Sequence, residues 1–230
     1  MKQLTTVGIV LNRTDFGEAD RILTMLTPQY GKLRLMARGV RRIKSKLAGG
    51  IELFSVSNIT FIRGRGEICT LISSRLQKHY ANIVQNLDRT MLGYDLIKLL
   101  HRATEDEPEP VYFQLLQDAF EALDNPIISP QLIRVWFSAQ LLRLAGHNPG
   151  LQVDDLGQKL ELRQNYVFNF DRMAFKSVDS GALTANHIKL LRLLFSANQP
   201  HVLAQVQGGE AVLSDLDPIV QTMLKTQIRI

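Results

Sequence analysis

The sequence predicts an α+β protein of two domains, a small five-stranded β-barrel followed by a mainly α-helical domain. Two patterns predict this order. In the first 76 residues, short apolar or β-branched runs alternate with turn-forming sequences, and from residue 79 onward apolar residues recur at helical spacing. A chain of 230 residues is also long enough for two modest domains. We therefore expect domains at 1–78 and 79–230.

Five segments of the first domain have the composition of strands. They are separated by turn-forming sequences such as TPQYGK and RGRG, and they cover residues 7–11, 21–26, 32–37, 54–62 and 67–76. Closing so few strands into a barrel removes the exposed sheet edges that a small domain could not otherwise protect. The commonest five-stranded barrel is the OB-fold, which we predict here.

One of these segments also shows which side chains face outward. In LRLMAR, Leu33 and Leu35 alternate with Arg34 and Met36, which is the period-2 pattern of a half-buried strand. The alternation predicts that Arg34 and Arg38 point away from the barrel core.

The second domain is predicted to be helical, with one irregular insertion. Helical spacing of apolar residues covers 83–100, 112–123, 132–144, 184–195 and 210–226, with Thr184 as an N-cap. Proline in EDEPEP and in DNPIISP separates the first three helices. Residues 147–182 lose this periodicity, and within them KLELRQ and YVFNFD predict a small hairpin around residues 160–170.

Positive charge is concentrated in the first domain. Residues 1–80 hold 14 Lys and Arg against 5 Asp and Glu, whereas residues 81–230 hold 13 against 17. Seven of the cations fall between residues 32 and 46 without an intervening acid. A basic loop is often only a solvated face, but here the whole barrel is basic. This asymmetry favours a nucleic-acid partner over a membrane.

The predicted nucleic-acid-binding residues are the cations of this segment and of the next turn. They are Lys32, Arg34, Arg38, Arg41, Arg42, Lys44, Lys46, Arg63 and Arg65. Few aromatic residues accompany them, because Phe54 and Phe61 fit a barrel core and only Phe16 and Tyr30 are then available. We therefore expect phosphate contacts to dominate, with weak sequence preference and with binding of both single- and double-stranded DNA.

The motifs of common enzymes and metal sites are missing from the sequence. It contains no G-x-x-x-x-G-K-[ST], no H-E-x-x-H, no paired C-x-x-C and no G-x-S-x-G. Its five histidines lie far apart, and Cys69 is best interpreted as a buried structural thiol. We expect neither catalysis nor a cofactor or metal. The apolar runs are too short for a membrane span, so we also expect a cytoplasmic, nucleoid-associated protein.

Four motifs in a fixed order resemble a known family. GIVL at 8–11, DFGEAD at 15–20, TPQYGK at 27–32 and ARGVRRIKSKL at 37–47 are similar to the N-terminal domain of the RecO family, bacterial mediators of DNA repair and recombination. LLRLAGHNPGL at 141–151 resembles a segment of that family's helical domain. Many members carry two zinc-binding C-x-x-C pairs after it. None follow here, so we predict a zinc-free domain in which the hairpin replaces the metal-held ribbon.

The resemblance implies a non-catalytic function in DNA repair. Members of the family bind single- and double-stranded DNA, anneal complementary strands, and act with RecR and often RecF to load RecA onto DNA coated by single-strand-binding protein. The acidic, Phe-ending C-terminal tail of single-strand-binding protein docks on their helical domain. Arg38, Arg41 and Lys44 match the family's basic motif, and Ile43 stands where proline is frequent. The other predicted cations rest on charge alone.

Two other functions stay open on the sequence. The first is an RNA-binding OB-fold module in translation or ribosome assembly, since phosphate contacts do not distinguish the two nucleic acids. The second is a non-catalytic adaptor whose basic surface binds an acidic protein partner.

Overall fold

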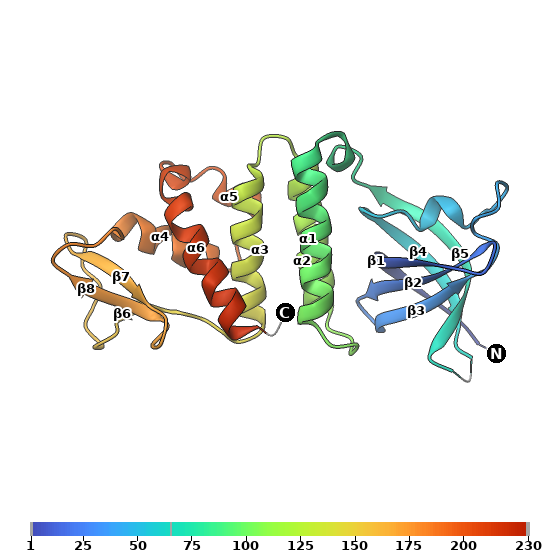
Figure 1. Ribbon diagram of the computed structural model, residues 1–230, viewed down its shortest axis with the longest axis horizontal. Coiled ribbons are helices and arrows are strands. Elements are labelled where there is room, and N and C mark those ends of the chain that lie inside the picture. Colours follow the sequence, from blue (N-terminus) through green and yellow to red (C-terminus); the bar gives the residue numbers. More distant parts are fainter. Residues whose placement is uncertain (1, 65, 229–230) are drawn as a thin grey trace. The chain divides into compact units, whose positions relative to one another are not determined.

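Five strands at the N-terminus close into a barrel with the order β1-β2-β3-β5-β4 (Figure 1). Their bounds are β1 Gln3–Phe16, β2 Asp20–Thr27, β3 Gly31–Ala37, β4 Ser55–Ile62 and β5 Ile68–His79. Strand β1 pairs with both β2 and β4, and β3 and β5 form a parallel pair between otherwise antiparallel neighbours. The result is the five-stranded, OB-like barrel that the sequence predicts.

This computed structural model describes residues 2–64 and 66–228. The chain forms two compact units, Met1–Asp124 and Asn125–Ile230. The first unit holds the barrel together with the first two helices, and the second holds the remaining helices and a small sheet. The predicted domain boundary between residues 78 and 79 falls just before the last residue of β5. That residues 1–78 and 79–230 are the two domains stays a prediction.

Strand β3 shows how the sequence pattern fills the barrel. Leu33, Leu35 and Ala37 are buried in its core, whereas Arg34 is exposed, as the alternation predicts. Val40 and Ile51, at either end of the connection that leads to β4, are buried in the same core. Both ends of this connection are therefore anchored to the barrel.

Two helices complete the first unit, α1 (Leu87–Ala103) and α2 (Pro110–Asp124). Asn86 caps α1, because its side chain accepts a hydrogen bond from the backbone N–H of Arg89 at 3.1 Å. Gly93 of α1 lies against the Phe54 ring, where an added Cβ would come within 2.6 Å of Cε1. The same ring also packs edge-on against Phe120 of α2 at 5.6 Å. Phe54 is thus one point at which both helices contact the barrel.

Lys32 joins the start of β3 to the end of α1. Its Nζ donates to the backbone oxygens of His101, at 2.8 Å, and Thr104, and lies 3.9 Å from Asp106 Oδ1. The last carbonyls of a helix lack partners within the helix, so a cation there is favourable. The side chain is only 6% exposed, and this burial lowers the pKa of Lys32 although the acid of Asp106 opposes the shift.

The turn before Lys32 fits the same joint. Gly31 has φ +64°, and an added Cβ would collide with the backbone oxygen of Asp106. The backbone N–H of Lys32 donates to that oxygen at 3.1 Å. Only glycine has both the conformational freedom and the size for this approach. Gly31 and Lys32, which end the TPQYGK motif, therefore hold the start of β3 against the segment that connects α1 to α2.

The second unit is built on α3 (Pro130–Leu144) and α6 (Gly209–Gln227), with α4 (Ala185–Leu194) and the short α5 (Pro200–Leu203) beside them. Arg134 of α3 forms an ion pair with Asp217 of α6. Thr184 is the N-cap of α4, as predicted, and its backbone N–H donates to His187 Nδ1 at 3.0 Å. In the described part of the chain, no helix is long and apolar enough to cross a membrane.

The chain forms a three-stranded sheet between the end of α3 and the start of α4. This sheet differs from the predicted hairpin. The strands are β6 (Gly150–Asp154), β7 (Asn165–Asn169) and β8 (Ala174–Val178), in the order β6-β8-β7. We predicted that KLELRQ pairs with YVFNFD, but β7 pairs with β8 instead. The reason is apolar packing. Phe175 of β8 is buried and meets the rings of Tyr166 and Phe168, whereas Leu162 is 73% exposed.

The sequence predicts that this region holds no zinc. Across the described residues, no three His, Cys, Asp or Glu side chains are grouped so that they could hold a metal ion. The apolar rings of β7 and β8 form the local core of the sheet.

Replacing Lys32 by Met should lower the free energy of unfolding by about 1–3 kcal/mol, because two partly buried carbonyls lose a charged donor. Chemical denaturation of the full chain measures this. Lys46→Met is the matched control, since that side chain is exposed, and its effect should stay within about 0.5 kcal/mol. Equal stability of the two variants would contradict a structural role for Lys32.

Candidate nucleic-acid interface

The basic loop, residues 38–47, follows β3 and consists of consecutive turns. Gly39 has φ +63°, the backbone N–H of Arg42 donates to its carbonyl at 3.2 Å, and that of Ser45 donates to the carbonyl of Arg42 at 3.0 Å. Val40 points into the barrel core and Leu47 packs against it. The loop therefore has a defined shape, and its apolar residues face inward at both ends.

Five cations of the basic loop are exposed as a consequence: Arg38, Arg41, Arg42, Lys44 and Lys46. Among the described residues, no carboxylate lies within 4 Å of a charged nitrogen on any of these except Arg41. Unneutralised like charges at this spacing repel one another, and an anionic ligand or solvent must screen them. The loop thus offers an unpaired positive surface.

Arg41 instead ties the basic loop to the turn between β1 and β2. Its backbone N–H donates to the carbonyl of Ala19 at 2.9 Å, and its Nη1 donates to the carbonyl of Gly17 at 3.3 Å. Its Nε lies 3.4 Å from Asp15 Oδ2. The hydrogen bond from Arg21, and then the positive charge of Arg41, hold the pKa of Asp15 below its ordinary value. The Asp15 carboxylate thus links Arg21 of β2 to Arg41 of the basic loop across this turn.

The outer face of β3 extends this surface. Arg34 is exposed there and lies 3.7 Å from the exposed carboxylate of Glu67. A surface pair of this kind is weak and easily replaced by a ligand phosphate. Arg38 is also exposed and comes directly after β3. Arg34 and the basic loop are therefore on neighbouring parts of the barrel surface.

The remaining predicted residues do not join this group. Lys32 is buried in the joint to α1. Arg63 stacks over the Tyr30 ring at 5.3 Å, beside the turn that begins β3. A strand rises about 3.3 Å per residue, so that turn and the basic loop are about 20 Å apart along β3. Arg65 lies outside the described residues.

Charge counting missed two features of the site. The first is that Lys32 is held by helix carbonyls, for which Gly31 in TPQYGK was the available local clue. The second is Phe16, whose ring is 53% exposed at the end of β1 beside the basic loop. The sequence already marks Phe16 as one of two aromatic residues available outside the barrel core.

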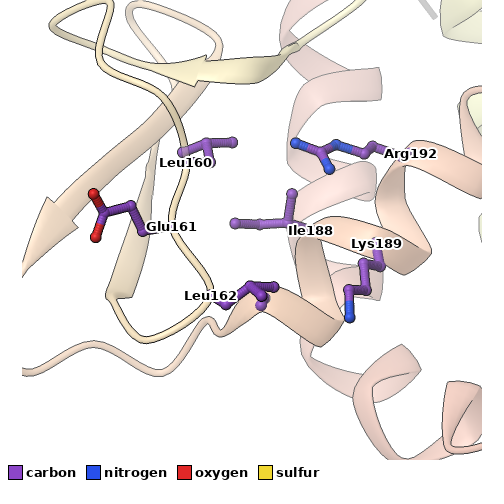
Figure 2. Close-up of a pocket in the computed structure, with 7 residues that line it drawn as sticks. Leu160, Glu161, Leu162, Ile188, Lys189 and Arg192 are labelled. Carbon is purple, nitrogen blue, oxygen red and sulfur yellow. The ribbon is translucent and has the colours of Figure 1, made fainter.

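A separate small pocket lies in the second unit (Figure 2). It is open to solvent and has a cavity volume of about 30 Å³, and it is lined by Leu160, Glu161, Leu162, Ala185, Ile188, Lys189 and Arg192. Figure 2 shows the Glu161 carboxylate turned away from the other labelled side chains. Arg192 is positioned by a hydrogen bond from its Nε to the carbonyl of Leu151 at 2.8 Å. The pocket thus combines apolar walls with two cations.

Comparison with known proteins covers almost the whole chain. Residues 1–80 match the family model described as recombination protein O N terminal, and residues 84–230 match recombination protein O C terminal. Two proteins of Dehalococcoides mccartyi named DNA repair protein RecO are 30% and 35% identical, and each alignment covers 96% of this chain and 88% of that protein. A Listeria innocua protein of the same name is 30% identical over 82% of this chain and 75% of its own length. The chain therefore belongs to the RecO family of DNA repair proteins.

Proposed function

We propose that this protein binds single- and double-stranded DNA without catalysing a reaction and anneals complementary strands in homologous recombination. The observation that carries this proposal is the set of four exposed cations on the ordered basic loop for which the described residues offer no carboxylate partner, namely Arg38, Arg42, Lys44 and Lys46. Arg34 and Arg41 supply two further positive charges whose existing partners are exposed.

Annealing follows from the chemistry of such a surface. Two complementary strands are both polyanions, and their mutual repulsion opposes the approach that pairing requires. Arginine and lysine side chains that contact phosphates release condensed counterions and neutralise part of this repulsion without reading base edges. The cations of the basic loop are suited to this task because they are exposed and unpaired.

Salt dependence distinguishes this function from an adaptor that binds an acidic protein. Four to six phosphate contacts give a log–log slope of affinity against salt of about −3 to −4 on single strands. A flat response would contradict DNA binding through the basic loop. Competition by RNA of equal length addresses the remaining alternative, because a protein that reads the 2′-OH prefers RNA.

We also propose that the protein acts with RecR, and in some settings RecF, to load RecA onto DNA coated by single-strand-binding protein. The family membership supports this role. For the C-terminal tail of single-strand-binding protein, we propose the pocket of the second unit as the docking site. Leu160 and Ile188 offer apolar contacts to a terminal Phe, and Lys189 and Arg192 offer positive charge to an acidic, carboxylate-ended peptide.

Reversing four cations of the basic loop to Glu should abolish strand annealing. The variant changes Arg38, Arg42, Lys44 and Lys46, and it keeps Arg41 because that side chain orders the β1–β2 turn. Its thermal transition should be nearly unchanged, since none of the four makes a described ion pair. Annealing of two labelled complementary oligonucleotides and thermal melting measure the two effects.

A control with the same change of net charge tests whether position matters. It reverses four exposed cations outside the barrel: Lys98, Arg102, Lys176 and Lys225. Annealing should persist in this control. Equal loss in both variants would mean that net charge, rather than the basic loop, drives annealing.

Lys189→Glu should weaken binding of an acidic peptide that ends in Phe by about fivefold, because an exposed attractive charge becomes repulsive. Titration of the labelled peptide with the full chain measures the affinity. Lys176→Glu is the control, since Lys176 is exposed on β8 and does not line the pocket. The same affinity in both variants would exclude the pocket as the docking site.

A further inference from the structure

Phe16 is the exposed member of the barrel's aromatic set. The sequence offers four such rings, Phe16, Tyr30, Phe54 and Phe61, and the structure describes all of them. Phe54 and Phe61 are buried, and Tyr30 packs edge-on against Phe61 at 5.3 Å beneath Arg63. Phe16 is 53% exposed. Its position is therefore not explained by packing of the barrel core.

Strand register places Phe16 on the outer face of the barrel. Phe16 pairs with Asp20, while Ile22, two residues farther along β2, pairs with Thr14 of β1 and Met36 of β3. Side chains alternate in step across paired strands, so Phe16, Ile22 and Met36 face the same side. Ile22 and Met36 are half-buried. Beyond Asp20, the direct partner of Phe16, Ile22 and Met36 continue this face as an apolar strip across β2 and β3.

Cations border this strip. Arg34 lies two residues before Met36 on β3, so its side chain faces the same side of the strand, where it is exposed. Arg38 is exposed directly after the end of the strand. Strands lie about 4.8 Å apart, so β1 and β3 are separated by about 10 Å. Arg34 pairs with Thr24, which pairs with Asn12, so Arg34 also lies four residues, about 13 Å, back along the strands from the level of Phe16. A single strand of several nucleotides can span the ring and both arginines.

The backbone around Phe16 is held in place. Gly17, with φ +57°, accepts a hydrogen bond from Arg41, and the backbone N–H of Gly39 donates to Asp20 Oδ1 at 2.6 Å. These two hydrogen bonds attach the β1–β2 turn, which follows Phe16, to the basic loop. A ring on an ordered backbone loses little conformational freedom when it binds a flat ligand.

We propose that Phe16 stacks on an unpaired base of a single strand whose phosphates contact Arg34, Arg38 and the basic loop. The inference rests on the proposed DNA binding, since the ring otherwise has no ligand on this face. In a duplex the base faces are covered by their neighbours, so the ring adds affinity for single strands alone. Phe16 then sets a preference for single-stranded DNA that phosphate contacts cannot supply.

Phe16→Ala tests this with three labelled ligands: an oligothymidylate of about 16 nucleotides, a duplex of equal length, and a single strand of abasic residues. The dissociation constant for oligothymidylate should rise about tenfold. The constants for the duplex and for the abasic strand should change less than twofold, and the salt slope should stay the same. Thermal melting should be unchanged, because the ring is exposed.

Two variants control the measurement. Phe16→Tyr keeps an aromatic face and should bind oligothymidylate as the parent does. Ile43→Ala removes a fully exposed apolar side chain from the basic loop and should leave all three constants unchanged. Three results would overturn stacking: an equal loss of affinity for duplex and single strand in Phe16→Ala, no loss in that variant, or the same loss in Ile43→Ala. The proposed function would still stand in these cases, provided that the parent binds DNA in a salt-dependent way. Failure of the parent to bind any of the three ligands overturns both.

Discussion

Closure of the barrel is the constraint on which the candidate interface depends. Because β1 pairs with both β2 and β4, each strand side chain faces either the core or the outer surface. Apolar residues fill the core, so the charges of β3 are forced outward. The chain leaves the barrel after Ala37 and returns at Ser55, and Val40 and Ile51 anchor both ends of this connection in the core. The cations between them cannot fold inward and remain in water, where a polyanion can reach them.

The neighbours of a cation, rather than its charge, decide its function. Lys32 and Arg38 lie six residues apart in one basic segment, yet Lys32 binds the carbonyls that end α1, whereas Arg38 has no described ionic partner. Arg41 is intermediate, since it orders the β1–β2 turn and still exposes part of its guanidinium. The basic segment therefore contains a residue that joins β3 to α1, a residue that orders the β1–β2 turn, and the candidate binding surface. Substitution of the whole segment would disturb all three.

Features set by local pattern could be predicted from the sequence, and those set by distant partners could not. The alternation in β3, the helical spacing and the Thr184 cap depend on neighbours along the chain, and the structure confirms them. The hairpin prediction was wrong because KLELRQ and the strand AFKSV both have acceptable strand composition, and burial of Phe175 decides between them. The burial of Lys32 depends on carbonyls beyond residue 100, and the outward position of Phe16 depends on register with β2 and β3.

A surface that anneals strands must bind them without occupying the edges that pair. Hydrogen bonds to the Watson–Crick edge would hold a single strand but would have to break before its complement could bind. In the proposed interface, phosphate contacts from Arg38 and the basic loop would leave every edge free, and stacking on Phe16 would use a base face. A base held in this way can still present its donors and acceptors to a second strand. Once the pair forms, neighbouring bases compete for the same face, so duplex formation displaces the ring. The proposed mode of binding, through phosphates and one ring, would thus favour release of an annealed product.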